Sequence, residues 1–117
     1  MVNAVPGLLT GVDITPSLIH GDLWIGNAGA TEEHGPIIFD PACFFGHHEM
    51  ELAMMTLFEG FRDDFWGAYH AKVPKAPGFE TRHKLYKLYY YLNQLNLFGD
   101  AGVKATCLRL AHELLLV

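Results

Sequence analysis

The chain has 117 residues, and half of them are hydrophobic, which is enough to bury the core of one domain. Eight Lys and Arg against thirteen Asp and Glu give a formal net charge of -5, which argues against a broad binding surface for nucleic acid or an anionic membrane. Two cysteines make no disulfide framework, and neither a secretory signal nor a membrane-spanning segment is apparent, so we expect a soluble protein of the reducing cytoplasm.

The first third of the chain predicts short extended segments. Prolines and glycines interrupt residues 1–16, which we interpret as an irregular lead-in. A short apolar run follows at 17–19. Residues 28–30 and 36–39 flank the polar stretch TEEHG, a pattern that predicts a small β-hairpin.

The rest of the chain predicts helices, at about 47–58, 63–72, 79–98 and 103–115. The first of them has apolar residues at helical spacing on one face, which we expect to be buried: Met50, Ala53, Met54, Leu57 and Phe58. The third ends at Gly99, a residue that commonly terminates helices. We therefore expect an α+β fold in which helices supply most of the mass and short strands carry the polar residues.

Three polar residues around the hairpin suggest a metal and phosphate site. If the turn centres on Glu33 and His34, Asn27 and Asp40 face each other across the open end of the hairpin. A carboxylate and an amide oxygen so placed can bind Mg²⁺, which prefers oxygen ligands. Asp22, in the loop before the hairpin, could then accept a proton from a substrate hydroxyl. The alternative is that each residue merely caps a turn or begins a bend.

Two sequence motifs resemble one kinase family. The segments HGDLWIGN and IIFDPA look like the catalytic loop and the metal-binding motif of aminoglycoside-phosphotransferase-like kinases. Together with GHHEMELAM and the stretch from KAPGFE to LFG, they resemble the fructosamine-3-kinase and ketosamine-3-kinase family, from about residue 16 to residue 99. The resemblance implies a protein-kinase-like fold. It implies that residues 17–117 are its mostly helical C-terminal lobe, with the catalytic loop at 20–27 and the metal motif at 40–42.

The resemblance also implies roles for individual residues. Asp22 matches the catalytic base, Asn27 and Asp40 match the Mg²⁺ ligands, and His20 matches a histidine that supports the loop. Trp24 matches a position near the sugar substrate. Asn93 and Asn96 match amides that would face the substrate cleft, with amides on the helix surface as the alternative. Glu51, followed by Leu and Ala, matches the acidic start of a helix that we expect to order the loop after Asp40, with a solvated carboxylate as the alternative.

The activity implied by the resemblance is ATP- and Mg²⁺-dependent phosphorylation of the 3-hydroxyl of ketosamines, attached to protein lysines or small amines, and hence protein deglycation. No nucleotide-covering N-terminal lobe fits before His20, so we expect an incomplete kinase. Two alternatives remain open: a non-catalytic binding module that self-associates through its exposed lobe interface, and an aminoglycoside- or choline-type small-molecule kinase.

Overall fold

The computed structural model describes residues 1–117 as a mainly helical chain with two small antiparallel sheets. A 3₁₀ turn, η1 (Val2–Ala4), is followed by a short helix, α1 (Val5–Leu8). The strands are β1 (Ser17–Ile19), β2 (Ala28–Thr31), β3 (Gly35–Ile38) and β4 (Phe44–Gly46), and the 3₁₀ turn η2 (Ile25–Asn27) precedes β2. The longer helices are α2 (His48–Met55), α3 (Asp63–Lys72), α4 (Phe79–Phe98) and α5 (Ala101–Leu115).

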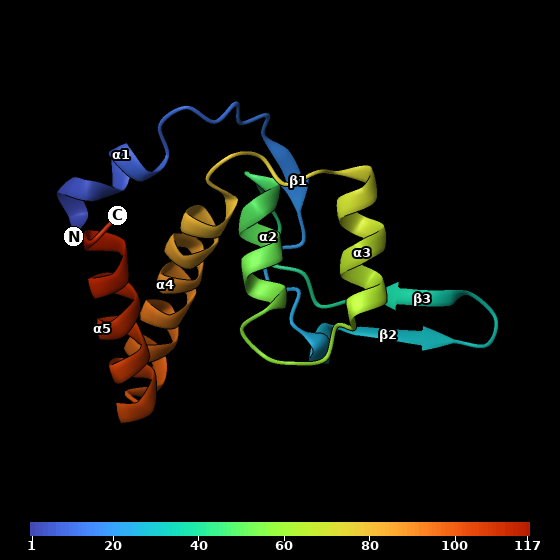
Figure 1. Cartoon of the computed structure of the whole chain (residues 1–117). Coiled ribbons are helices and arrows are strands. Elements are labelled where there is room, and N and C mark those ends of the chain that lie inside the picture. Colours follow the sequence, from blue (N-terminus) through green and yellow to red (C-terminus); the bar gives the residue numbers. More distant parts are fainter.

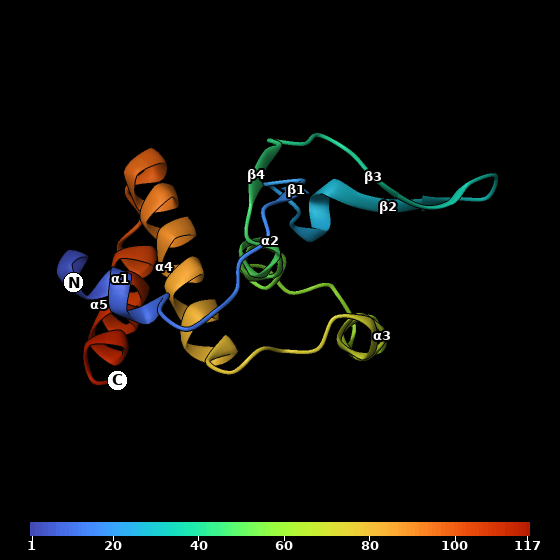
Figure 2. The ribbon, with the colours of Figure 1, turned by 90° about the horizontal axis from the view of Figure 1, so that it is seen from above.

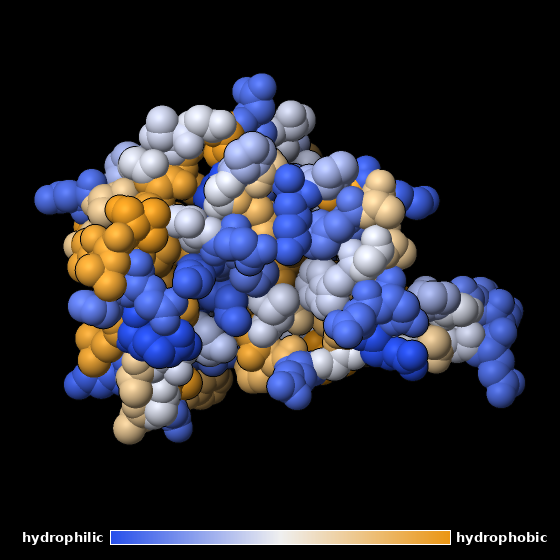
Figure 3. Space-filling view, viewed as in Figure 1, coloured by the Kyte–Doolittle hydropathy of each residue, from blue (hydrophilic) through white to orange (hydrophobic).

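The helices form one row, and the hairpin extends from one end of it. In Figures 1 and 2, α5 and α4 lie side by side, α2 occupies the middle and α3 stands on the other side of α2. Both termini lie at the α5 end, whereas the β2–β3 hairpin projects beyond α3. The projecting part of this hairpin is mostly hydrophilic, and orange, hydrophobic surface gathers at the α4–α5 side (Figure 3). The two ends of the molecule therefore differ in surface character.

The α4–α5 pair carries the largest core cluster. Its buried members come from both helices: Leu85, Leu88, Cys107, Leu110 and Leu114. Helix α5 begins at Ala101, two residues before the predicted start, because the side chain of Asp100 accepts a hydrogen bond from the backbone N–H of Val103 (2.9 Å) and caps the helix.

The buried side of helix α2 differs from the face that its sequence pattern predicts: Ala53 and Met54 are buried, but Phe58 lies beyond the helix and is 43% exposed. Leu52 and Met55 pack in a cluster with Phe79, while Ala53 and Met54 pack in a second cluster with Tyr90. The helix ends at Met55, three residues earlier than predicted, and a turn follows. A central helix with neighbours on several sides has no polar face, so periodicity identifies only part of its buried surface.

A buried ion pair holds α2 to α4. Arg82 donates from Nε and Nη2 to the two carboxylate oxygens of Glu49, at 2.7 and 2.8 Å, and both residues are 2% exposed or less. Its Nη1 also donates to the carbonyl oxygen of Pro77 (2.7 Å) in the segment before α4. No pattern in the sequence predicts this pair.

The predicted hairpin is present, but the predicted register is wrong by one residue. Ala28 pairs with Ile38 and Thr31 with Gly35, so the turn consists of residues 32–34 and centres on Glu33. Gly35 has φ 70°, a conformation that glycine adopts without steric penalty, and it closes a three-residue turn. Asn27 therefore does not face Asp40: its carbonyl oxygen accepts a hydrogen bond from the N–H of Phe39 (3.0 Å).

The predicted lead-in is more ordered than its prolines and glycines indicate. Residues 2–8 form η1 and α1, and Pro6 is compatible with α1 because it lies within the first turn, where a missing N–H breaks no helical hydrogen bond. Residues from Gly11 to Pro16 are irregular, as expected. The strands β1 and β4 pair with each other. None of the helices is long and apolar enough to cross a membrane.

Candidate functional site

The loop from His20 to Asn27 is held at its start by a carboxylate from α2. Glu51 accepts hydrogen bonds from the backbone N–H groups of His20 and Gly21, through one oxygen each. Two charge-assisted hydrogen bonds to adjacent N–H groups fix the direction of the chain as it enters the loop. Glu51 therefore binds the loop that leads to Asp22, whereas its position in the sequence predicted that it would order the loop after Asp40.

His20 joins this loop to the one that contains Asp40. Its side chain is buried; Nδ1 accepts a hydrogen bond from the N–H of Asp22 (3.2 Å), and Nε2 lies 2.6 Å from the carbonyl oxygen of Phe39. The N–H group of Asp22 leaves Nδ1 as the acceptor, so Nε2 carries the proton and donates to Phe39. The backbone oxygen of His20 also accepts from the N–H of Ala42 (2.8 Å). Residues on both sides of Asp40 are thus attached to His20.

Gly21 is required by the close approach of these two loops. It has φ 86°, and a Cβ at this position would lie 2.1 Å from the carbonyl oxygen of Ala42. A larger residue would push the two segments apart. Gly26 is similar, because a Cβ there would lie 2.1 Å from the ring of Trp24. Trp24 can therefore lie across the loop.

Asp22 and Asn27 are in direct contact. The amide Nδ2 of Asn27 donates to the carbonyl oxygen of Asp22 (2.9 Å) and to its carboxylate Oδ2 (3.3 Å). Asn27 is 6% exposed, so these bonds fix its orientation. Because the nitrogen faces Asp22, the amide oxygen of Asn27 is the atom left for a ligand.

Asp40 follows Phe39, whose N–H donates to the carbonyl oxygen of Asn27, and it has a strained backbone conformation. It is the one non-glycine residue with positive φ (51°), a region that costs energy for residues with a side chain and is often found at functional sites. Its side chain is exposed, and the preceding residue, Phe39, is hydrogen-bonded to both His20 and Asn27. A carboxylate and an amide oxygen form the hard-oxygen donor set that suits Mg²⁺.

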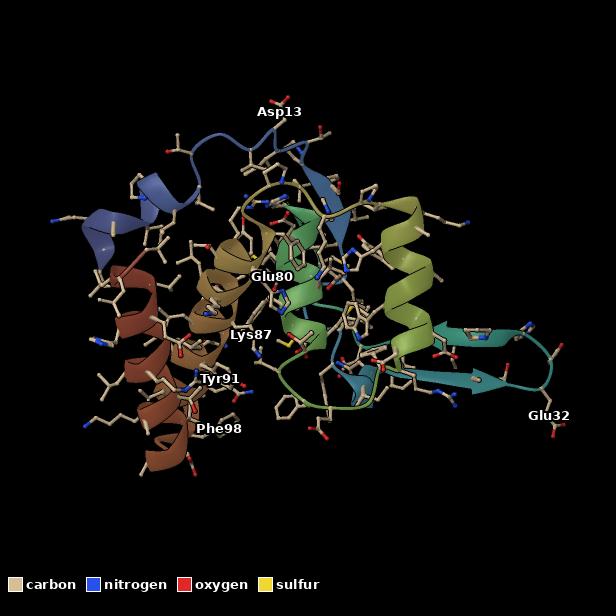
Figure 4. The ribbon with its side chains drawn as sticks, in the orientation of Figure 1. Asp13, Glu32, Glu80, Lys87, Tyr91 and Phe98 are labelled. Atoms are coloured by element: carbon tan, nitrogen blue, oxygen red, sulfur yellow. The ribbon has the colours of Figure 1, made fainter.

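A cavity of about 570 Å³ opens next to Asp22. Its walls come from the loop at 21–24, from Ala42 and Phe44, from Met54 and Phe58, and from one side of the C-terminal half of α4. Trp24 lines it, with its ring edge-to-face with Phe58 at a centroid distance of 5.4 Å. Figure 4 shows Phe98, another lining residue, at the end of α4, and Glu32 at the distant tip of the hairpin.

The cavity contains two of the three residues predicted to lie near a substrate. Trp24 and Asn93 line it, but Asn96 does not; Asn96 is exposed on another side of α4. Sequence reasoning missed Gln94 and Tyr90, which also line the cavity. Aromatic and amide residues occur on several sides of α4. Which of these sides faces the cavity depends on how α4 packs, so the sequence alone does not identify the lining residues.

A second group of metal-binding residue types has a structural explanation. Ligand atoms of His47, His48 and Glu49 lie within 4.8 Å of one another. However, both oxygens of Glu49 bind Arg82, and Nδ1 of His47 is hydrogen-bonded to the hydroxyl of Tyr86 (2.9 Å). Burial lowers the pKa of His47, which favours the uncharged ring beside Arg82.

Comparison with known sequences identifies close relatives. The family model described as fructosamine kinase matches residues 1–115. A Mus musculus protein named ketosamine-3-kinase is 50% identical over 110 residues, which are 94% of this chain and 35% of the relative. A chloroplastic protein-ribulosamine 3-kinase of Oryza sativa subsp. indica is 43% identical over 108 residues, 92% of this chain and 31% of the relative.

Solved structures agree with these relatives. A Haemophilus somnus 129PT structure, assigned as a fructosamine-3-kinase, superimposes with a TM-score of 0.84 at 31% identity, over 97% of this chain and 39% of that one. A Thermobifida fusca structure with the same assignment gives a TM-score of 0.85 at 35% identity, over 99% and 40% of the two chains. The chain thus spans about a third of the curated relatives and two fifths of these structures.

Fold and site together define the α+β, mostly helical part of a protein-kinase-like structure, which confirms the predicted fold class. The match of the family model over nearly the whole chain then gives the family: the chain belongs to the fructosamine kinases.

Proposed function

We propose that the protein acts as an ATP- and Mg²⁺-dependent ketosamine 3-kinase, which phosphorylates the 3-hydroxyl of ketosamine adducts on protein lysines or small amines. Removal of such adducts would make it a protein deglycation enzyme. The names of the relatives, ketosamine-3-kinase and protein-ribulosamine 3-kinase, support this substrate class. Because the chain spans about a third of their length, we propose the activity for the protein of which it forms part.

The observation that supports the proposal most is the contact between Asp22 and Asn27 at the edge of the cavity. Asn27 donates to one carboxylate oxygen of Asp22 and orients the group, while Asp22 itself lines the cavity. A positioned carboxylate beside a cavity can accept the proton of a substrate hydroxyl as that hydroxyl attacks phosphorus. Trp24 and Asn93, in the cavity wall, would then bind the sugar.

Asn27 and Asp40 are the residues that would hold Mg²⁺. The amide nitrogen of Asn27 is hydrogen-bonded to Asp22, which leaves the amide oxygen for a ligand. Asp40 offers an exposed carboxylate, and the residue before it, Phe39, is hydrogen-bonded to the backbone of Asn27. Bound Mg²⁺ would neutralise charge on the ATP phosphates. His20 and Glu51 position the two loops, so their contribution is to keep these side chains in place.

A matched pair of variants tests the proposal. D22N preserves the size of the side chain but removes the proton acceptor, so we expect phosphorylation of fructosyl-lysine by the full-length protein with ATP and Mg²⁺ to fall at least about a hundredfold. The control is D13N, an equal change in charge on an exposed loop that lies away from the cavity side of the molecule (Figure 4). Full turnover by D22N would refute the assigned role of Asp22.

The choice of acceptor needs its own experiment. Fructosyl-lysine, ribulosyl-lysine, an aminoglycoside and choline are offered to the same preparation. Phosphorylation of the two ketosamines alone supports the proposal, and phosphorylation of an aminoglycoside or choline alone supports the alternative of another small-molecule kinase.

A second candidate is a non-catalytic binding module that self-associates. It is favoured by exposed large side chains on the β1–β4 sheet, where Leu18 is 64% and Phe45 72% exposed. Exposed apolar surface often marks an interaction site. Sedimentation velocity decides whether the chain associates, and association without any turnover by the full-length protein would favour this candidate over the kinase.

The proposed location is the cytoplasm. Cys43 and Cys107 are both free thiols, in agreement with a reducing compartment. Cell fractionation of the tagged full-length protein tests this, and recovery with organelles, the location named for the rice relative, would contradict it.

A further inference from the structure

A second cavity, of about 510 Å³, lies on the side of α2 that faces away from α4. Its walls come from β1, the β2–β3 hairpin, α2 and α3, and Figure 2 shows the hairpin and α3 on that side. It shares no lining residue with the cavity beside Asp22: Leu23 lines it, whereas Asp22 and Trp24 line the other. The two cavities are therefore distinct.

Aromatic rings form one wall of this second cavity. Phe61 precedes α3, Phe65 and Tyr69 lie on α3, and the successive ring centroids are 5.6 and 6.0 Å apart. Most of the other lining residues are apolar, and no lysine or arginine is among them. Apolar walls with a few polar groups are typical of sites that bind small organic molecules.

Two polar groups in the wall are available to a ligand. Tyr69 is half-buried, its hydroxyl makes no hydrogen bond within the chain and, unlike the hydroxyl of Tyr90, this group is not closed to solvent. Glu51 is the one carboxylate in the wall, and it makes no ion pair. Burial, followed by the charge of Glu51, raises the pKa of the Tyr69 hydroxyl, so the negative potential of Glu51 extends to this hydroxyl.

These features favour a cation with an apolar body. An ammonium group beside Tyr69 would donate to the free hydroxyl oxygen, lie in the negative potential of Glu51 and contact aromatic faces. A neutral alcohol could make the hydrogen bond but would gain nothing from the potential. An anion would be repelled by it and would find no lysine or arginine in the wall.

We propose that the cavity between the hairpin, α2 and α3 binds an organic amine in its protonated form, with the ammonium group at Tyr69 and the apolar body against α2 and the hairpin. This inference does not rest on the proposed kinase activity, which concerns the cavity beside Asp22. Leu23 belongs both to the wall and to the catalytic loop, so a bound amine also contacts that loop.

Three probes that share one apolar body and differ in the head group test the choice of ligand: 4-phenylbutylamine, 4-phenylbutanol and 4-phenylbutyrate. Each is titrated by calorimetry into the full-length protein and, separately, into the 117-residue chain. The titrations are done at pH 8, where an alkylamine is protonated and histidines are ordinarily neutral.

Two variants locate the binding site. Y69F keeps the ring and removes a hydroxyl that has no partner in the chain, so it should unfold at the wild-type urea concentration. Y89F is the matched control, because it makes the same change at a tyrosine that lines the cavity beside Asp22 and not this one.

We expect the amine to bind wild type at least about fivefold more tightly than the alcohol does, and the carboxylate to bind most weakly. Y69F should bind the amine about tenfold more weakly than wild type, the effect of one hydrogen bond to a charged group. Y89F should bind it as wild type does. The full-length protein and the 117-residue chain should agree.

Each of the remaining outcomes overturns the inference. Equal affinity for the three probes, or a preference for the carboxylate, excludes a cation site. Weaker binding by Y89F but not by Y69F places the amine in the cavity beside Asp22. Weaker binding by a destabilised Y69F shows that the hydroxyl has a structural role.

A comparison of the two proteins separates the last cases. Binding by the 117-residue chain but not by the full-length protein shows that another part of the protein fills the cavity, and binding by neither shows that no such site exists. The kinase proposal is unaffected by any of these results, because turnover by D22N tests it at the other cavity.

Discussion

Asp40, the proposed Mg²⁺ ligand, has a strained backbone conformation. A carboxylate at φ 51° is energetically unfavourable, although Asp and Asn tolerate this region better than other residues with a side chain. The conformation persists because Phe39 and Ala42, on either side, are both hydrogen-bonded to fixed groups. The hydrogen bonds of the surrounding loop therefore keep Asp40 in this strained conformation.

This arrangement predicts that stability and cation binding respond differently to substitution of Asp40. D40G removes the carboxylate and relieves the strain, so it should unfold at nearly the wild-type urea concentration. D40A removes the same carboxylate but keeps a Cβ at positive φ, and it should be about 1 kcal/mol less stable than D40G. Both variants should lose binding of Mn²⁺, a substitute for Mg²⁺ whose binding is measured by broadening of NMR signals from residues 20–27.

The matched control for cation binding is D64N, at an exposed aspartate in α3. D64N should retain the broadening seen in wild type. If D40A broadens the same signals as wild type does, Asp40 is not a ligand, whatever its effect on stability.

At the residue scale, spacing in the sequence predicted part of the site. The Asp22 to Asn27 separation, with Gly21 before it and Gly26 within it, indicated a loop, and the structure brings these two side chains into contact. The roles of both residues remain proposals. Tyr90 and Gln94 could not be predicted, because which side of α4 faces the cavity depends on how α4 packs against α2.

Among the elements, α2 and α4 depend on the buried pair of Glu49 and Arg82. The two charges satisfy each other, and burial of one without the other is highly unfavourable. We expect R82M to reduce the free energy of unfolding by about 3 to 5 kcal/mol, because it leaves Glu49 buried and unpaired. The double variant E49L/R82M should be closer to wild type than R82M is, since both charges are gone. Urea denaturation measures these differences.

The control is R109M, which removes an exposed arginine that pairs with Glu113 on the surface of α5. An exposed pair contributes little, so R109M should change the unfolding free energy by less than about 1 kcal/mol. A double variant as unstable as R82M would show that the helices need the ion pair itself for packing.

His83, on α4, makes the stability of the α2–α4 contact dependent on pH. Its Nε2 is hydrogen-bonded to the hydroxyl of Thr56 (2.9 Å), Nδ1 is buried without a partner, and burial lowers the pKa of the ring to about 4, with Lys87 contributing. In the unfolded chain the same group titrates near its ordinary value of 6.5. Acid therefore protonates the unfolded state first, and the stabilisation is complete above pH 6.5 and lost as the pH falls towards about 4.

H83Q should flatten this part of the pH profile of stability, which is measured by thermal unfolding at pH 7.5, 6, 5 and 4. His47 also has a pKa lowered by burial, so H83Q should reduce the acid sensitivity without removing it. H34Q, at an exposed histidine in the hairpin turn, is the control. Equal slopes for H83Q and wild type would show that His83 titrates alike in the folded and unfolded states.

The elements themselves were largely predictable, and their ends and register were not. Helices α3 and α4 occupy the residues that their sequence patterns indicated, because both begin and end at clear signals such as Gly99. The register error came from Gly35, whose positive φ adds a third residue to the turn and shifts every pair by one. Two-residue and three-residue turns around the same polar stretch were indistinguishable by composition.

At the scale of the whole molecule, the chain is elongated. Its extents are 48 × 34 × 25 Å and its radius of gyration is 15.1 Å, against about 13 Å for a compact domain of this length. The projecting hairpin accounts for part of this shape, as Figure 1 shows. The sequence pattern around residues 28–39 predicted that two strands pair there. It did not indicate whether the pair lies against the core.

The surface of the whole molecule combines net negative charge with exposed apolar groups, and this predicts a pH-dependent association. At pH 7 the net charge of -5 keeps copies apart, whereas near the isoelectric point of 5.7 the repulsion disappears. Apolar side chains on the β1–β4 sheet, Leu18 and Phe45 among them, can then bring copies together. Dynamic light scattering should show the apparent radius rising between pH 7.5 and 5.7 while far-UV circular dichroism remains unchanged.

F45K should reduce this rise in radius, because it removes apolar surface from the β1–β4 sheet. A105K, at an exposed position on α5, adds the same charge but leaves the sheet unchanged, so it should not reduce the rise. Equal radii for wild type and F45K at pH 5.7 would exclude this sheet as the contact.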